Sequence, residues 1–66
     1  MFEKYKGQNV IIILQDNFRK FGKLISEDNF FLLIEFYNGK QQPISKADIK
    51  AIDYDMHVNN KDITLK

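Results

Sequence analysis

The chain has no cysteine, and its 66 residues include only one histidine, one proline and three glycines. Without cysteine there is no disulfide framework and no thiolate metal site, and His57 alone cannot build a zinc site. Small domains bury a modest share of their surface, so they usually depend on disulfides, metals or oligomerisation. We therefore expect no metal and no cofactor, and we expect copies of the chain to associate with one another.

The chain also lacks long apolar runs and a strong excess of charge of either sign. No apolar stretch reaches the roughly 18–20 residues of a membrane span, and the N-terminal residues MFEKYKGQ do not resemble a signal peptide. Together with the lack of cysteine, this favours a cytoplasmic protein with no membrane partner. Ten basic and nine acidic residues give a net charge of +1, which does not by itself indicate a nucleic-acid partner.

β-Branched and aromatic residues, in contrast, are plentiful, and turn signals separate them into short runs. Strands are predicted over residues 10–14, 18–26, 30–37, 40–44 and 49–54. The turn pairs at residues 16–17 and 38–39 indicate hairpins on either side of the central strands. Residues 45–48 indicate a single 3₁₀ turn, with Ser45 as its cap.

Three positions within these strands constrain the sheet. Gly22 lies in mid-strand, which predicts a sharp bend or a close approach of two backbones. Pro43 predicts that its end of the strand lies at a sheet edge or at a strand terminus. Residues 30–34 are apolar without interruption, so a strand there places large side chains on both faces. One small domain cannot easily cover both faces.

Five short strands with one 3₁₀ turn before the last describe a small, strongly bent all-β barrel of the SH3-like or OB-like size class. The tight connection between the fourth and fifth strands favours the SH3-like barrel. We expect a single domain with its core at residues 7–54, a short helical turn at 1–6 that Gly7 ends, and a C-terminal extension at 55–66.

The spacing of several motifs resembles that of the Sm-like superfamily. The segment from Gly22 to Phe30, GKLISEDNF, is similar to the Gly-x-hydrophobic-x-x-x-Asp-Gln-Phe segment of the bacterial, Hfq-like branch. Residues 43–49 resemble the last turn of that branch. The chain departs from the family where Leu32 replaces a base-binding Asn of the archaeal and eukaryotic branches, and where Ala47 replaces the His of Hfq.

The resemblance implies a homo-oligomeric ring, from pentamer to heptamer, that binds single-stranded U- or A-rich RNA. In such rings the fourth strand of one copy pairs with the fifth strand of the next, so both sheet edges are covered. Ile11, Ile13 and Tyr54, with the outward residues of the third strand, are then expected to gain partners in the neighbouring copy.

The resemblance also implies an RNA-binding site at the central opening. It consists of Asp28, Asn29, Phe30 and Lys46. Phe30 would stack on a base, Asn29 would read a base edge, and Lys46 would contact a phosphate or carbonyl oxygen. The alternative interpretation is that Phe30 belongs to the core and that Asp28 only caps its turn.

A second candidate surface consists of Arg19, Lys20 and Lys23 in one predicted hairpin. These residues could contact RNA phosphates at the rim, or they could be an ordinary solvated hairpin. The chain shows no Ser-His-Asp order, no paired carboxylates on a rigid scaffold and no Gly-rich phosphate loop, so we do not expect an enzyme. The rival function is an SH3-like protein-interaction or structural module without nucleic-acid binding. A regulator that binds duplex DNA is disfavoured by the weak positive charge.

Overall fold

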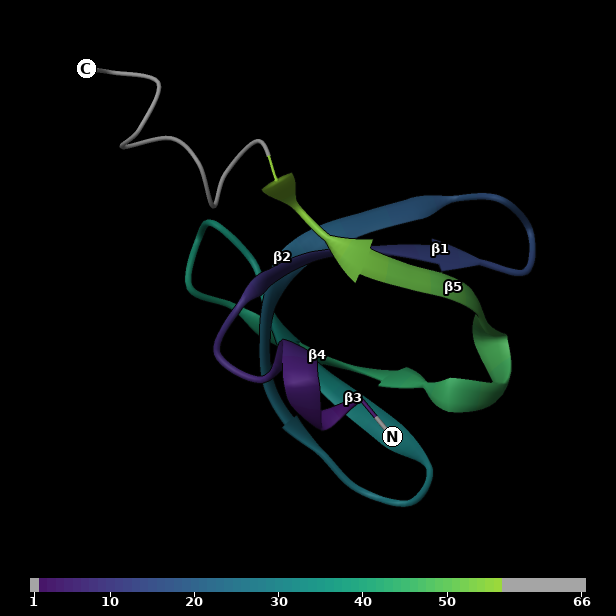
Figure 1. The fold of residues 1–66 in the computed structure, drawn as a ribbon, viewed down its shortest axis with the longest axis horizontal. Coiled ribbons are helices and arrows are strands. Elements are labelled where there is room, and N and C mark those ends of the chain that lie inside the picture. Colours follow the sequence, from purple (N-terminus) through teal and green to yellow (C-terminus); the bar gives the residue numbers. More distant parts are fainter. Residues whose placement is uncertain (1, 57–66) are drawn as a thin grey trace.

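The computed structural model describes residues 2–56, and it folds them into one antiparallel sheet. The strands are β1 (Asn9–Leu14), β2 (Arg19–Glu27), β3 (Phe31–Glu35), β4 (Gln41–Ser45) and β5 (Ile49–Tyr54). Two 3₁₀ turns accompany them, η1 (Glu3–Tyr5) before β1 and η2 (Lys46–Asp48) between β4 and β5. The strand order is β4-β3-β2-β1-β5, and the sheet curls strongly on itself (Figure 1). The prediction of a small, bent, five-stranded all-β fold is confirmed.

The predicted strand boundaries differ from the observed ones at most ends, and the difference matters at Phe30. The last strand was predicted with its observed bounds, and the 3₁₀ turn follows Ser45, whose hydroxyl accepts a hydrogen bond from the Ala47 N–H at 3.3 Å. Phe30 was predicted as the first residue of the third strand, and this prediction is wrong. It lies in the preceding turn, because the Asp28 carboxylate takes its backbone N–H away from the strand ladder.

Two of the hairpins share one geometry. The β1–β2 and β3–β4 connections are three-residue loops, at 15–17 and 37–39, each closed by a backbone hydrogen bond of 2.8 Å. The third loop residue has a left-handed backbone in both, with φ of 72° at Asn17 and 82° at Gly39. The turn signals at 16–17 and 38–39 therefore gave the correct positions of both hairpins.

Gly22 lies where β2 passes very close to its neighbouring strand β3. A Cβ atom at this position would lie 2.6 Å from the Glu35 carbonyl oxygen and 2.6 Å from the Ile34 Cγ2 atom, which no side chain can occupy. The β2–β3 register shifts between Leu24 and Ser26, so a bulge follows Gly22 on the same strand. A bulge increases the local bend and twist of a strand. The predicted close backbone approach is confirmed, and β2 bends around it.

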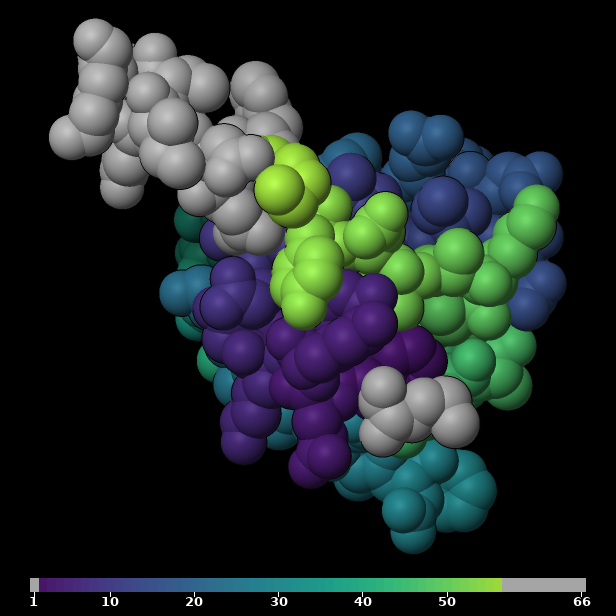
Figure 2. Space-filling view, viewed as in Figure 1, coloured from purple at the N-terminus to yellow at the C-terminus, as the bar shows by residue number. Residues whose placement is uncertain are grey.

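The core lies on the concave side of the sheet, under the N-terminal turn. Its buried residues are Tyr5, Val10, Ile12, Leu24, Leu32, Ile34 and Ile44. The Gly7 N–H donates to the Leu24 carbonyl oxygen at 2.8 Å, which holds η1 across the concave side (Figure 1, purple). In the space-filling view this N-terminal segment covers the middle of the face (Figure 2). Gly7 has φ of 80° and ends the turn, as predicted.

Tyr54 belongs to this concave side. The β1–β5 register pairs it with the buried Val10, and paired residues point to the same face. Its ring packs 4.7 Å from the Tyr5 ring, centroid to centroid, and its hydroxyl donates to the Lys4 carbonyl oxygen at 3.2 Å.

The outer face of the sheet carries large apolar side chains. Along β3, Leu32 and Ile34 are buried while Phe31 remains exposed and Leu33 half-buried, which confirms the prediction of apolar side chains on both faces. Pro43 of β4 lies beside Leu33 and is exposed. Across the sheet, Phe21 of β2 lies opposite Ile11 of β1 on the same outer side.

β4 and β5 form the two edges of the sheet, and neither has a second strand neighbour within residues 2–56. Hydrogen bonds join Phe36 to Lys40 and Lys46 to Phe30 at the two ends of the β3–β4 ladder. Antiparallel pairs alternate between bonded and non-bonded, so the Leu33–Pro43 pair is a non-bonded one. The Pro43 nitrogen therefore faces the free edge, as predicted. No helix in the described residues is long and apolar enough to cross a membrane.

Candidate functional site

The turn between β2 and β3 is fixed by one carboxylate. Oδ1 of Asp28 accepts the backbone N–H of Phe30 at 2.8 Å and that of Phe31 at 2.7 Å. These two hydrogen bonds hold the pKa of the Asp28 carboxyl below its usual value. The Phe30 side chain is 72% exposed on this turn. Asp28 therefore caps the turn, as one interpretation held, but Phe30 does not belong to the core.

Lys46, at the start of η2, reaches this turn from the end of β4, the strand that pairs with β3. Its backbone N–H donates to the Phe30 carbonyl oxygen at 2.8 Å, which ties η2 to the β2–β3 turn. Its ammonium group forms an ion pair with Glu27, the last residue of β2, with Nζ 2.5 Å from Oε2. Lys46, which was expected to contact an RNA phosphate, is thus already paired with a carboxylate of the same chain.

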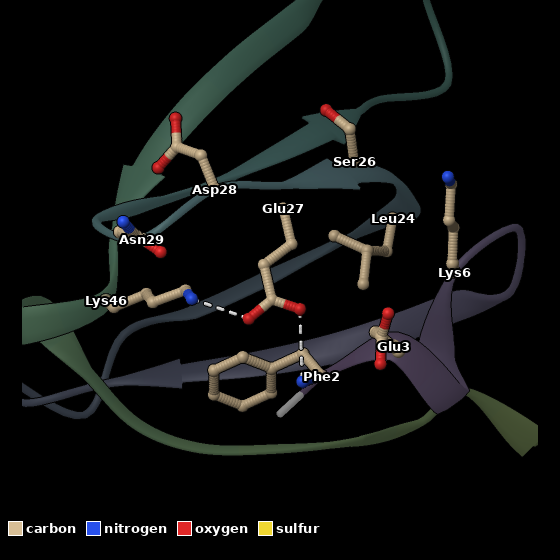
Figure 3. A pocket seen from close by; sticks show the side chains of 9 residues that line it. All are labelled: Phe2, Glu3, Lys6, Leu24, Ser26, Glu27, Asp28, Asn29 and Lys46. Carbon is tan, nitrogen blue, oxygen red and sulfur yellow. Dashed lines mark hydrogen bonds and ion pairs between the residues drawn. The ribbon is translucent and has the colours of Figure 1, made fainter.

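The N-terminal segment completes this ion pair. The backbone N–H of Phe2 donates to Oε1 of Glu27 at 3.1 Å, and the Lys46 Nζ lies 5.7 Å from the centroid of the Phe2 ring. Figure 3 shows the Lys46 ammonium and the Phe2 nitrogen converging on the two oxygens of Glu27. The Glu27 side chain is only 15% exposed. The hydrogen bond from Lys46, and then that from Phe2, lowers the pKa of the Glu27 carboxyl, so it stays ionised at neutral pH.

A cavity of about 350 Å³ opens beside this ion pair. Its lining consists of Phe2, Glu3, Lys6, Leu24, Ser26, Glu27, Asp28, Asn29 and Lys46 (Figure 3). Leu24 and the Phe2 ring supply apolar surface, while three carboxylates outnumber two ammonium groups. The lining therefore has no excess of positive charge. An anion is attracted here only if the carboxylates are neutralised or displaced.

Four of the predicted site residues lie together. Asp28 and Asn29 line the cavity with Lys46, and Phe30 stands next to it on the same turn. The proximity that the resemblance implied is present in a single copy of the chain. Asp28, however, uses Oδ1 to fix its own turn, and the ammonium of Lys46 is paired.

The predicted basic surface on β2 does not form one patch. Arg19 lies opposite Ile13 and Lys23 lies opposite Asn9, whereas Lys20 lies opposite the buried Ile12, on the other side of the sheet. Arg19 and Lys20 begin β2, at the end remote from the 28–30 turn. The alternation of side chains along a strand separates residues that are adjacent in sequence.

Sequence reasoning missed two parts of this surface. The first is the pair of Phe2 and Glu27, for which the sequence carries no local signal. The second is the repeated tripeptide Asp-Asn-Phe, at 16–18 and again at 28–30, which the sequence displays openly. At the first copy, Oδ1 of Asp16 accepts the Phe18 N–H at 3.0 Å. Phe18 is 71% exposed, and Lys50 Nζ donates to Oδ1 of Asn17 at 2.9 Å.

Within residues 2–56, no three His, Cys, Asp or Glu side chains are placed so that they could hold a metal ion. His57 and most of the expected C-terminal extension, residues 57–66, lie outside the described residues.

Comparisons with known proteins bear on the fold. No protein-family model matches the sequence, and no curated protein gives a significant match. One similar solved chain comes from a structure of the Dcp1:Dcp2 mRNA decapping complex and its activation by Edc3 and Scd6. It is 23% identical, with a TM-score of 0.73 over 82% of this chain. The match covers 58% of that chain, so this chain spans little more than half its length. At that identity the likeness concerns the fold alone.

Proposed function

We propose that the protein is a cytoplasmic, Sm-like RNA-binding protein of the Hfq-like type and not an enzyme. Copies form a homo-oligomeric ring, and the ring binds single-stranded U- or A-rich RNA by base stacking. The observation that carries the proposal is the exposure of Phe30, a large aromatic side chain on a turn that the Asp28 carboxylate holds rigid. A rigid, exposed aromatic ring is the surface on which an unpaired base stacks.

Self-association is supported by the edges and the outer face of the sheet. β4 and β5 have no second strand neighbour within residues 2–56, and head-to-tail pairing of one with the other leaves no edge free. The outward side chains of Phe31 and Leu33 also lie beside the β4 edge. Burying two such side chains per subunit stabilises the assembly by very roughly 3–6 kcal/mol. This is comparable to the whole stability of a small domain.

RNA binding then follows from repetition. Each base that stacks on an aromatic side chain contributes about 1–3 kcal/mol, and a ring presents one Phe30 turn per subunit. Linked weak sites bind together far more tightly than one site does. In this proposal the Asn29 amide reads a base edge next to Phe30, and Arg19, Lys20 and Lys23 contribute attraction for phosphates at other parts of the surface.

The test is fluorescence anisotropy with short oligo-U and oligo-A at low salt, on the parent protein and two variants. Phe30→Ala removes the stacking side chain from every subunit, so we expect it to weaken binding by at least the roughly 5- to 150-fold that one stacked base contributes. Phe18→Ala is the matched control, because Phe18 is equally exposed and its N–H is likewise bonded to an Asp two residues before it. We expect it to change affinity much less. Absence of binding by the parent at tens of micromolar, with the oligomer intact, contradicts the proposal.

A second candidate function is an SH3-like protein-interaction or structural module. The observation that favours it is the Glu27–Lys46 ion pair, which engages the lysine whose backbone is bonded to Phe30. The cavity beside this pair carries more carboxylates than ammonium groups. Under this function the exposed apolar residues of the outer face contact a partner protein, and RNA affinity is negligible in the parent as well as in Phe30→Ala. The same anisotropy experiment therefore separates the two candidates.

A further inference from the structure

Glu27 binds the same lysine, Lys46, that an RNA phosphate would contact. Its carboxylate contacts the Lys46 ammonium at 2.5 Å, and RNA phosphate oxygens offer the same kind of acceptor to the same cation. We propose that Glu27 sets the RNA affinity of the 28–30 turn, because phosphate has to displace this carboxylate before Lys46 can contact the RNA. The inference rests on the proposed function and deepens it.

The surroundings of the pair explain why the competition is effective. Glu27 is held from both sides, since Oε1 accepts the Phe2 N–H while Oε2 contacts Lys46. The Lys46 ammonium also lies over the face of the Phe2 ring, a second favourable contact for a cation. Both charged side chains are largely covered, at 25% and 15% exposure. A phosphate therefore meets an ammonium group that is already fixed and neutralised.

The arrangement has a direct consequence for salt dependence. Each phosphate contact in a single-stranded complex contributes about −0.7 to the slope of log affinity against log salt. In the parent protein Lys46 should contribute little to this slope, although it lies beside Phe30. Releasing Lys46 from Glu27 should add one contact.

Glu27→Gln is the informative variant, because the glutamine oxygen can still accept the Phe2 N–H while the charge is lost. Its matched control is Glu3→Gln, which makes the same change in net charge on the lining of the same cavity without touching the ion pair. The two variants are compared by anisotropy with oligo-U and oligo-A between 50 and 200 mM salt. Circular dichroism and light scattering confirm that each remains folded and assembled.

We expect Glu27→Gln to bind RNA more tightly than the parent and to steepen the salt slope by about 0.7 for each subunit that contacts the RNA. For one such contact, its advantage over the parent should be about 2.5-fold larger at 50 mM than at 200 mM salt. Glu3→Gln should show a smaller change. Lys46→Gln should leave the parent slope nearly unchanged, yet it should cancel the gain when combined with Glu27→Gln.

Three results contradict the inference, and they are distinguishable. If the parent binds RNA but Glu27→Gln binds no more tightly and with the same slope, Glu27 is not a competitor and only this inference fails. The same conclusion follows if Lys46→Gln alone lowers the parent slope by about 0.7, since Lys46 then already contacts phosphate. If the parent does not bind RNA at tens of micromolar with the oligomer intact, the proposed function fails and this inference fails with it.

Discussion

The two ends of β2 carry the same tripeptide, Asp-Asn-Phe, at residues 16–18 and 28–30. In both copies the Asp carboxylate accepts the Phe backbone N–H, at 3.0 Å in the first and 2.8 Å in the second. In both copies the phenylalanine is almost equally exposed, at 71% and 72%. Three residues therefore specify a local hydrogen bond and an outward aromatic side chain on both sides of this strand.

The surroundings of the two tripeptides differ completely. The 16–18 copy closes a three-residue hairpin, with Asn17 in the left-handed region and its amide bonded to Lys50. The 28–30 copy borders the cavity, where Phe2 and Lys46 converge on Glu27. The comparison teaches that the tripeptide supplies the turn, whereas distant segments supply the chemistry around it.

The bend of β2 produces this difference, so breaking the bend should have the largest effect. A methyl group at Gly22 would meet the Glu35 carbonyl oxygen and Ile34 at 2.6 Å. We predict that Gly22→Ala lowers the free energy of unfolding by about 1–3 kcal/mol, the usual range for overpacking. Urea denaturation measures the loss. Ser26→Ala, at an exposed position of the same strand, is the control and should stay within about 0.5 kcal/mol of the parent. Equal stability of Gly22→Ala and the parent would show that the backbones do not meet at this point.

Asp28 should contribute more to the stability of the fold than Asp16 does. Asp28 accepts two backbone N–H groups, whereas Asp16 accepts one. We predict that Asp28→Ala destabilises the protein about twice as much as Asp16→Ala, because each lost acceptor leaves one N–H without its partner. Thermal unfolding of the two variants measures the ratio. A larger loss for Asp16→Ala would reverse the comparison and make the hairpin the more tightly fixed turn.

Low pH should destabilise the protein at the turn formed by residues 28–30. The pKa of Asp28 is lowered from its ordinary value of 3.8 by the Phe30 and Phe31 N–H groups, and that of Glu27 from 4.5 by Lys46. A carboxyl with a lowered pKa stabilises the folded state above its unfolded pKa, and this contribution is lost as pH falls through the folded pKa. We expect stability to decline below about pH 4.5 on account of these groups.

An NMR titration resolves this effect residue by residue. The amide protons of Phe30 and Phe31 should shift together with a midpoint below 3.8. Midpoints at or above 3.8 would mean that the Asp28 carboxylate does not accept these amides in solution.

The smallest effect is expected at the other end. Lys50 reaches Asn17 through an exposed hydrogen bond between two side chains. We predict that Lys50→Ala changes the free energy of unfolding by less than about 0.5 kcal/mol, as most exposed polar substitutions do. Chemical denaturation provides the measurement. A loss above 1 kcal/mol would indicate that this contact organises the hairpin and that the two turns are more alike than we describe.

The features that sequence predicted correctly are those with local causes. The bounds of β5, the Ser45 cap, the edge position of Pro43 and the close approach at Gly22 each follow from the chemistry of one residue or a short run. The place of Phe30 was predicted as strand because its side chain suits a strand. A side-chain acceptor two residues earlier outweighed that preference.

The contacts of the site could not be predicted in the same way. The Glu27–Lys46 pair joins residues 19 apart in sequence, and the Phe2–Glu27 hydrogen bond joins residues 25 apart. Both depend on how the curled sheet brings η1, η2 and the end of β2 together. The resemblance to Sm-like proteins placed Lys46 near Phe30, but it gave no reason to expect a competing carboxylate.

The most direct test of the account is the mass of the RNA-free protein in solution, by light scattering across a range of dilutions. In the proposed ring, neighbouring copies cover the β4 and β5 edges and the outward side chains of β3. We therefore predict an assembly of five to seven times the subunit mass of 7.8 kDa. A stable monomer at every concentration would contradict the proposed ring, because a single copy would then be stable with its sheet edges and outer apolar side chains exposed to water.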